Sequence, residues 1–350
     1  MTDLNDSRTS AIVIGAGPIG LETAIRLTQR KIDYLHIEAG QIGQIIADFP
    51  PLTQFFSSNE RISIAGVPIP SATQAKCRRE EYLAYLRAVA DQFDLLIKTY
   101  ERVIDIHQST GGFTLHTGKR NGESHTYQTR NIILATGGTA SPRALNIPGD
   151  DLPHVTHDLG DIHQYWRERV LIIGGKNSAV ESAIRCHYAG AEVTISYRGS
   201  EFSPRIKYWL RPELDMLIKK GAIDMHFNTI PTRITPTHVT LASTKDDRPG
   251  ATVELEADRV LAMIGYRADM SLCRMLGVEL NGEAEVPTFH EETMETNVPG
   301  VYVAGTASAG TQSGFQVYIE NSHIHADRIA RAIAGEAPPP PPKPVILAES

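Results

Sequence analysis

One glycine-rich pattern occurs twice in this chain, and this repeat constrains the fold more than any other feature of the sequence. Residues 12–26 read IVIGAGPIGLETAIR, and residues 171–185 read LIIGGKNSAVESAIR. Each copy is an apolar run, a glycine-rich turn and a stretch with helical periodicity, which is the order of a Rossmann strand, turn and helix. One such motif would be weak evidence, but two in the same context predict two dinucleotide-binding units.

The residue types of each turn suit the diphosphate of a dinucleotide. Gly15 permits a sharp turn, Gly17 lets a diphosphate approach the backbone, and Gly20 lets helix and strand pack closely. The helix that follows presents unpaired N–H groups and a partial positive charge. In the second copy Lys176 replaces the second glycine, and it could either crowd the phosphates or pair with them. We expect diphosphate contacts from Gly15, Gly17, Pro18, Gly20, Gly174, Gly175, Lys176, Asn177, Ser178 and Ala179.

The end of the second strand in each unit indicates which nucleotide binds there. An acid at this place hydrogen-bonds a ribose, whereas a cation accepts a 2′-phosphate. Glu38 stands there in the first unit, and the aligned residues of the second unit are Tyr197 and Arg198. The first site therefore suits FAD, and the second suits NADPH rather than NADH. Arg205 and Lys207 could complete a phosphate clamp, or these cations could form a solvated surface.

Both units end in a strand followed by small residues. These strands are expected at 132–138 (IILATGG) and 260–266 (VLAMIGY), and 297–310 supplies one more strand and a glycine-rich loop. Phe49, Phe55 and Phe56 follow the first motif, where they could stack on the isoalloxazine ring or pack in the core. Further cofactor contacts are expected from Thr136, Gly137, Gly265, Gly305 and Thr306.

This order of elements predicts an α/β fold of two nested Rossmann-like dinucleotide-binding domains. We expect a discontinuous FAD domain at 1–152 and 268–335, and an inserted NADPH domain at 153–267. A Pro-rich tail follows at 336–350, where consecutive prolines predict an extended spacer or a ligand for a Pro-binding partner.

The composition excludes several other functions. The net charge of −7 leaves no basic excess to neutralise phosphates, so we expect no nucleic-acid partner. No secretory signal and no apolar run long enough to span a bilayer is present, so no membrane association is expected. Cys77, Cys186 and Cys273 are far apart, which excludes a C-x-x-C dithiol and a thiolate metal site. These features predict a cytoplasmic protein without a metal.

Several longer motifs resemble those of one flavoprotein family. They are GAGPIG at 15–20, FFSSNERISIAGVPI at 55–69, IIGGKNSA at 172–179, YRGSEFSPRIKYW at 197–209 and AMIGYRAD at 262–269. On these motifs the chain resembles the bacillithiol-disulfide reductase family of thioredoxin-reductase-like FAD/NADPH flavoproteins, up to about Ala334. The resemblance implies a three-layer thioredoxin-reductase-like fold, a homodimer or higher homo-oligomer, and an NADPH-dependent reductase of a low-molecular-weight thiol disulfide.

Two positions depart from the patterns of related proteins. In the resembled family a cysteine commonly follows the proline of the first glycine motif and is the proposed redox thiol, but this chain has Ile19. An isoleucine cannot act as a nucleophile, so a thiol mechanism at this position is excluded. Thr306 stands where many related FAD proteins have Asp after Ala-Gly, and its hydroxyl would bond the ribityl chain more weakly than a carboxylate.

Three other side chains are candidates for catalysis. Cys77 is flanked by cations such as Arg78 and Arg79, and these charges with a helix N-terminus would lower its pKa. His323 and His325 could supply a proton, because imidazole titrates near neutrality. The alternative is that each of the three is a structural residue.

Three functions stay open at this stage. The first is electron transfer from NADPH through FAD to a thiol disulfide such as bacillithiol disulfide. The second is reduction of a ferredoxin or flavodoxin, which needs no cysteine. The third is a slow-turnover flavoprotein that senses the NADPH/NADP⁺ ratio.

Overall fold

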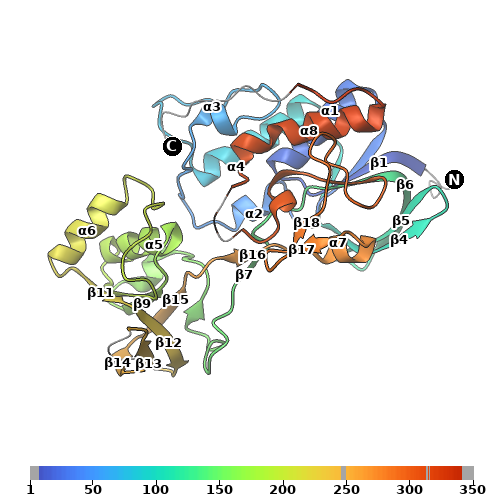
Figure 1. Ribbon diagram of the computed structural model, residues 1–350. Coiled ribbons are helices and arrows are strands. Elements are labelled where there is room, and N and C mark those ends of the chain that lie inside the picture. Colours follow the sequence, from blue (N-terminus) through green and yellow to red (C-terminus); the bar gives the residue numbers. More distant parts are fainter. Residues whose placement is uncertain (1–7, 246–249, 313, 315, 341–350) are drawn as a thin grey trace. The chain divides into compact units, whose positions relative to one another are not determined.

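The computed structural model describes residues 8–245, 250–312, 314 and 316–340, and the chain divides into two compact units (Figure 1). Unit 1 consists of Met1–Ser141 and Arg267–Ser350, and unit 2 is Pro142–Tyr266. The chain therefore leaves unit 1, builds unit 2 and returns. The division falls between Ser141 and Pro142 rather than at the expected 152/153 boundary, because the intervening apolar residues belong to the core of unit 2. These residues are Leu145, Ile147 and Leu152.

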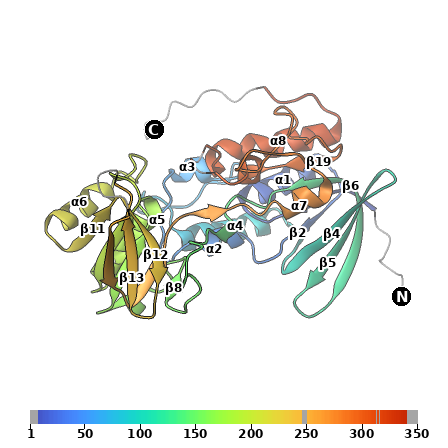
Figure 2. The same ribbon diagram turned by 60° about the horizontal axis from the view of Figure 1, so that its bottom comes forward.

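Unit 1 contains a seven-stranded mixed sheet with the order β3-β2-β1-β6-β5-β4, and β19 pairs with β6. The strands β1, β2, β3 and β19 and the second half of β6 are parallel, whereas β4, β5 and the first half of β6 form an antiparallel ribbon (Figure 2). The strands of this sheet are β1 (Arg8–Ile14), β2 (Tyr34–Ile37), β3 (Ile97–Lys98), β4 (Glu101–Ser109), β5 (Gly112–Lys119), β6 (Ser124–Leu134) and β19 (Val301–Val303).

Both faces of the parallel part are covered, so β1 is apolar at successive positions rather than at alternate ones. Ala11 and Val13 pack on one face against α1 and α8, which lie side by side (Figure 1). Ile12 and Ile14 pack on the other face, in a core that includes residues of the antiparallel ribbon and of α7. The helices of unit 1 are α1 (Pro18–Gln29), α2 (Gln44–Ala47), α3 (Asn59–Ile62), α4 (Arg79–Gln92), α7 (Ser271–Leu276), the 3₁₀ helix η2 (Gly305–Ala309) and α8 (Ile319–Ala334).

Unit 2 is built around a five-stranded parallel sheet with the order β11-β10-β9-β15-β8. One face packs against α5 and α6, and the other against a three-stranded antiparallel sheet. The parallel strands are β8 (Val155–Thr156), β9 (Arg169–Ile173), β10 (Glu192–Tyr197), β11 (Ile223–Phe227) and β15 (Arg259–Ala262). The other elements are η1 (Ile162–Tyr165), α5 (Asn177–Tyr188), α6 (Arg211–Lys219), β12 (Thr229–Ile234), β13 (His238–Ser243) and β14 (Thr252–Glu256).

Two short two-stranded sheets complete the fold. The strands β7 (Ser141–Pro142) and β16 (Tyr266–Arg267) pair where the chain passes from one unit to the other, and β17 (Leu280–Asn281) pairs with β18 (Val286–Pro287). No helix in the described ranges is long and apolar enough to cross a membrane. Residues 336–340 of the predicted tail adopt no regular secondary structure, and residues 341–350 lie outside the described part of the chain.

The sequence repeat is a structural repeat. Gly15 and Gly174 each follow the first parallel strand of their unit, with φ of 107° and 144°. A Cβ atom on Gly15 would collide with the Ala135 carbonyl oxygen, and one on Gly174 with the Met263 carbonyl oxygen. Only glycine fits such a turn. The predicted α/β fold with a Rossmann-like unit at each glycine motif is confirmed.

Candidate functional site

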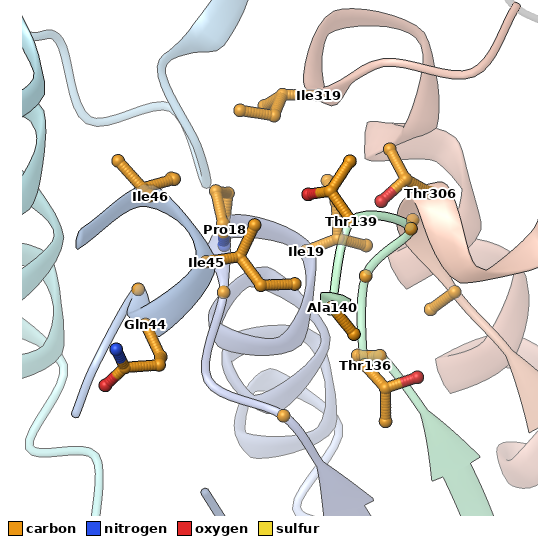
Figure 3. Close-up of a pocket in the computed structure, with 18 of the residues that line it drawn as sticks. Pro18, Ile19, Gln44, Ile45, Ile46, Thr136, Thr139, Ala140, Thr306 and Ile319 are labelled. Carbon is orange, nitrogen blue, oxygen red and sulfur yellow. The ribbon is translucent and has the colours of Figure 1, made fainter. Parts of the chain in front are cut away.

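A cavity of about 580 Å³ lies in unit 1 at the carboxyl ends of β1, β2, β6 and β19. Its size is in the range of small-molecule sites, and open parallel sheets bind ligands at this edge. Figure 3 shows the side chains of Pro18, Ile45, Thr139 and Ile319 around one common space. The predicted site residues that line it are Gly15, Gly17, Pro18, Glu38, Phe49, Phe56, Thr136, Gly137, Gly305 and Thr306.

The first glycine motif leaves room for a ligand at one of its three glycines. A Cβ on Gly15 or Gly20 would collide with backbone atoms, whereas a Cβ on Gly17 would meet no atom within 4 Å. Gly17 is also the N-cap of α1, with no side-chain cap and with Pro18 as the first helical residue. The N–H groups of this helix start therefore need a partner from the cavity, and a diphosphate supplies one.

Glu38 lies at the β2 end of the cavity as a fixed acceptor. Its two carboxylate oxygens accept hydrogen bonds from the N–H groups of Ala16 and Gly40, both at 2.7 Å. Each oxygen keeps a second acceptor site, which suits the hydroxyl groups of a ribose. Glu38, the residue predicted to bind a ribose, thus lies beside the glycine turn.

The aromatic residues of the cavity have mixed roles. Phe55 packs on Tyr82 of α4 with ring centroids 4.7 Å apart, and Phe49 lies 6.3 Å from Phe55, so both belong to the core as well as to the cavity wall. Phe56 is 41% exposed and carries Lys76 over its ring at 5.1 Å. Phe49 and Phe55 thus pack in the core, which is one of the two expectations, and stacking on the isoalloxazine ring stays a prediction for all three residues.

Ile19 puts an aliphatic side chain at the cavity wall. It is almost fully buried and packs in the core between the sheet and α8. A Cβ atom on Gly305 would lie 3.2 Å from the Ile19 Cβ atom, so the two backbones approach closely. None of the described cysteines lines the cavity.

The expected activation of Cys77 is contradicted. Its side chain is 2% exposed in the core beneath α4, and burial, with the Glu81 charge, raises the pKa of the thiol to about 12. The neighbouring cations do not act on the sulfur, because Arg79 donates to the Ala47 carbonyl oxygen and pairs with Glu80. Burial likewise raises the pKa of Cys186 to about 12 and that of Cys273 to about 11.

The two histidines of α8 are structural residues and do not line the cavity. His323 contacts the Glu22 carboxylate at 2.6 Å and the Arg61 carbonyl oxygen at 2.9 Å. Burial opposes its protonation, but the hydrogen bond and charge of Glu22 outweigh this and raise its pKa. His325 accepts a hydrogen bond from the Gly305 N–H at 3.2 Å, and burial lowers its pKa to about 4. The expected proton donor is therefore not found at either position.

In unit 2, α5 begins at the second glycine motif, with Lys176 exposed at its N-cap. Asn177 accepts a hydrogen bond from the Lys207 N–H at 2.7 Å and donates to the Arg205 carbonyl oxygen at 3.3 Å. Asn177 therefore holds the 205–207 segment against the start of α5. Exposed Arg205 and Arg198 both follow β10, as a clamp on a 2′-phosphate requires.

Among the other residues predicted for the second site, Tyr197, Gly175 and Ala179 are packed within the fold. The Tyr197 ring fills the space beside Gly175 and Gly199, where any Cβ would collide with it. Ala179 is buried at the start of α5, Ser178 is exposed, and Gly265 adopts a φ of 94°.

Lys207 does not join the clamp. It is 8% exposed, and its ammonium group pairs with the Glu181 carboxylate at 3.0 Å. Glu181 occupies the same place in α5 as Glu22 in α1, and each is held by a basic residue from a distant segment. The sequence showed the charge of Lys207 but not its partner.

Ser57 and Glu320 are cavity residues that we did not single out from the sequence. Both line the wall, and the Ser57 hydroxyl donates a hydrogen bond to the Glu320 carboxylate. The FFSS motif and the three residues before His323 contain them, but no glycine pattern or spacing marks either one. Among the residues that the structure describes, no cluster of three or more His, Cys, Asp and Glu side chains could hold a metal ion.

The chain is similar in sequence to one known family of enzymes. The model of the pyridine nucleotide-disulphide oxidoreductase family matches residues 12–305. The chain is 38% identical to bacilliredoxin reductase Bdr of Bacillus subtilis (strain 168), over 93% of this chain and 97% of that protein.

Two solved structures have the same fold. Bacillithiol disulfide reductase Bdr from Bacillus cereus is 36% identical, with a TM-score of 0.88, and 94% of this chain and 99% of that chain are covered. Thioredoxin reductase from T. acidophilum is 21% identical, with a TM-score of 0.72 over 94% of this chain and 99% of that chain. The predicted thioredoxin-reductase-like fold is confirmed.

Proposed function

Because the chain belongs to the pyridine nucleotide-disulphide oxidoreductase family, we propose that it passes electrons from NADPH through FAD to a low-molecular-weight thiol disulfide. The chain is an oxidoreductase of this family, and the family uses FAD and NADPH as cofactors. We place FAD in the cavity of unit 1 and NADPH at the start of α5 in unit 2. The acceptor is a disulfide of the bacillithiol type.

The observation that carries the proposal is similarity over nearly the full length to proteins named for this chemistry. A bacilliredoxin reductase is 38% identical over 93% of the chain, and a bacillithiol disulfide reductase matches with a TM-score of 0.88. The sequence identities of 38% and 36% are well above those at which only the fold is shared. The similarity covers both units, which supports a nucleotide site in each.

The residues of the cavity fit FAD. Bound flavin supplies two-electron redox chemistry, which no side chain of the protein carries. Glu38 orients the adenosine ribose, and the start of α1 beside Gly17 binds the diphosphate. Thr306 lies on the opposite wall and offers a hydroxyl group to the ribityl chain.

The acceptor must be reduced without a thiol at the cavity wall. Ile19 occupies the position of the thiol proposed for the resembled family, and the described cysteines are buried away from the cavity. The disulfide therefore enters the cavity itself. The same observation favours the second candidate function, reduction of a ferredoxin or flavodoxin, since one-electron carriers need no thiol.

The stoichiometry of turnover separates the two functions. With bacillithiol disulfide as acceptor, we expect two thiols for each NADPH consumed, and the Cys77→Ser variant should behave like the wild type. Thiol release is measured with a chromogenic disulfide after the protein has been removed. NADPH consumption that requires ferredoxin, without thiol release from the disulfide, would contradict the proposal in favour of the second function.

We further propose a cytoplasmic homodimer or higher homo-oligomer. Cys77, Cys186 and Cys273 are free thiols, which is the expected state in a reducing compartment. Sedimentation of the holoprotein would test the dimer.

A further inference from the structure

Thr139 brings a hydroxyl group to the wall of the cavity in unit 1. It follows β6 and lines the cavity together with Thr306. A Cβ atom on Gly137 would collide with the Ile45 side chain, and one on Gly138 would lie 3.4 Å from the Thr306 Cβ atom. The two glycines therefore let the chain pass closely between α2 and η2, and Thr139 is the first polar side chain after them.

The wall that contains Thr139 is mostly aliphatic. Figure 3 shows Thr139 beside Ile19 and Thr306. A Cβ atom on Gly305 would lie 3.2 Å from the Ile19 Cβ atom, so the backbone before Thr306 lies against the start of α1. Ile319 also lines the cavity, and neither isoleucine has a side-chain hydrogen-bond donor. A polar atom that enters here therefore meets hydroxyl groups among aliphatic side chains.

The order of the strands places this wall at the end of the cavity opposite Glu38. Glu38 follows β2, the glycine turn follows the neighbouring β1, and Thr136 and Thr306 follow β6 and β19 on the far side of β1. A dinucleotide with its ribose at Glu38 and its diphosphate at Gly17 therefore extends its redox-active end toward Thr139.

The Thr139 hydroxyl group is available to a ligand. It makes no hydrogen bond to any residue in the part of the chain that the structure describes, and the residue is half-buried. By contrast, the hydroxyl groups of Thr23, Thr117 and Thr129, which are buried in unit 1, each donate a hydrogen bond to a protein oxygen at 2.6–3.0 Å. Because hydroxyl groups in a fold normally have a partner, Thr139 can take one from the cavity.

Cleavage of a disulfide in this cavity benefits from such a donor. One NADPH supplies two electrons and one proton, water supplies the second proton, and the S–S bond breaks to give two thiols. A sulfur atom that leaves among aliphatic side chains carries negative charge until it is protonated, and burial destabilises that charge. A hydroxyl donor to the thiolate reduces this penalty.

We propose that the Thr139 hydroxyl group donates a hydrogen bond to the thiolate that leaves when the acceptor disulfide is cleaved. Thr139 is thus a catalytic residue that contacts the substrate rather than a residue that holds the cofactor. The inference rests on the proposed function, since it requires a disulfide in the cavity of unit 1. The acceptor that it fits is a disulfide of alkyl thiols, whose basic thiolates gain most from a donor.

The test is the rate at which bacillithiol disulfide reoxidises the reduced holoprotein, followed anaerobically by stopped-flow absorbance. Thr139→Val keeps the shape of the side chain but removes the hydroxyl group, and it should slow reoxidation about tenfold, the effect of one hydrogen bond to a charged group. Thr139→Ser keeps the donor and should stay close to the wild type. The rate of flavin reduction by NADPH should be the same in all three proteins.

Two other acceptors separate this role from a structural one. Ferricyanide takes single electrons and releases no thiolate, so Thr139→Val should reduce it at the wild-type rate. An aromatic disulfide releases weakly basic thiolates, so the same substitution should slow its reduction less than that of bacillithiol disulfide. The matched control is Thr126→Val, which removes an exposed hydroxyl group on β6 outside the cavity and should behave like the wild type in every assay.

The outcomes distinguish the inference from the proposed function. Reduction of bacillithiol disulfide by Thr139→Val at the wild-type rate would overturn the inference and leave the proposed function intact. An equal loss of rate with ferricyanide would also overturn it, because the substitution would then act on the flavin or on the fold. If the valine variant does not bind FAD, Thr139→Ala provides the same measurement. A wild-type protein that reduces no disulfide would contradict the proposed function together with the inference.

Discussion

His323 joins three helices of unit 1 through one side chain. It lies on α8 and contacts Glu22 of α1 and the backbone of Arg61 in α3. Both contacts are to acceptors, so the ring uses both nitrogens as donors only when it is protonated. The charged histidine therefore stabilises the packing of these helices rather than the chemistry in the cavity.

This arrangement predicts a pH dependence of stability. The pKa of His323 is raised in the folded protein, so its contribution is complete below the unfolded value of about 6.5 and is lost as pH rises through the folded pKa. His323→Gln should lower the free energy of unfolding by about 2 kcal/mol at pH 5.5, and by less at pH 9. Urea denaturation at both pH values measures the difference.

The control for this prediction is His290→Gln, which changes an exposed histidine of the same unit and should have no such effect. A difference between wild type and His323→Gln that grows with increasing pH would contradict the assigned charge state.

Cys77 leads to a second prediction at this scale. Because it is buried and its pKa is raised to about 12, it should not react with a chromogenic disulfide until the protein unfolds. Cys77→Ser should cost about 1–2 kcal/mol of stability, since it buries a hydroxyl group, while turnover with NADPH is unchanged. Rapid labelling of Cys77 in the folded protein, or loss of turnover at full FAD content, would show that the thiol is active.

At the scale of elements, the turn between β1 and α1 allows a matched pair of substitutions. Gly17→Ala places a methyl group in the open cavity and should weaken FAD binding by about tenfold while the melting temperature of the apoprotein stays close to that of the wild type. Gly20→Ala places the same methyl group against the Gly15 carbonyl oxygen and should destabilise the fold. Flavin fluorescence and thermal melting measure the two effects.

The two variants control for each other. Equal effects on FAD binding and on melting would contradict the assignment of separate roles to the two glycines.

We propose that the segment after β10 determines the choice of nicotinamide nucleotide. Arg198→Ala should raise the KM for NADPH by about tenfold and leave that for NADH unchanged, because only NADPH carries the 2′-phosphate. Arg167→Ala, another exposed arginine of unit 2, is the control. An equal rise in both KM values would mean that Arg198 does not recognise the phosphate.

The sequence was most informative about elements whose geometry only one residue type permits. Gly15 and Gly174 adopt turns that need glycine, so the two Rossmann units and their order were predictable. Contacts between residues that are distant in the sequence were not predictable. The pairing of Lys207 with Glu181 and that of Ser57 with Glu320 depend on packing that no local pattern shows.

The cations next to Cys77 in the sequence led to a wrong prediction for the pKa of its thiol. A helix does begin beside it, as expected, but Arg79 turns toward Ala47 and the sulfur is buried. The domain boundary differed for a similar reason, because the apolar residues between 142 and 152 pack forward into unit 2.

At the scale of the whole molecule, the central claim is that two nucleotide-binding units reduce a thiol disulfide without a cysteine at position 19. The relevant facts are the aliphatic wall at Ile19, the buried cysteines and the full-length similarity to bacilliredoxin reductase. From these facts we propose that the disulfide is reduced in the cavity of unit 1.

The most direct test is an anaerobic reoxidation experiment. The holoprotein is reduced with stoichiometric NADPH, bacillithiol disulfide is added, and the flavin absorbance is followed. We predict prompt reoxidation with release of thiol, in the wild type and equally in Cys77→Ser. A flavin that stays reduced with the disulfide but is reoxidised by a ferredoxin would contradict the account and identify the protein as a reductase of an electron carrier.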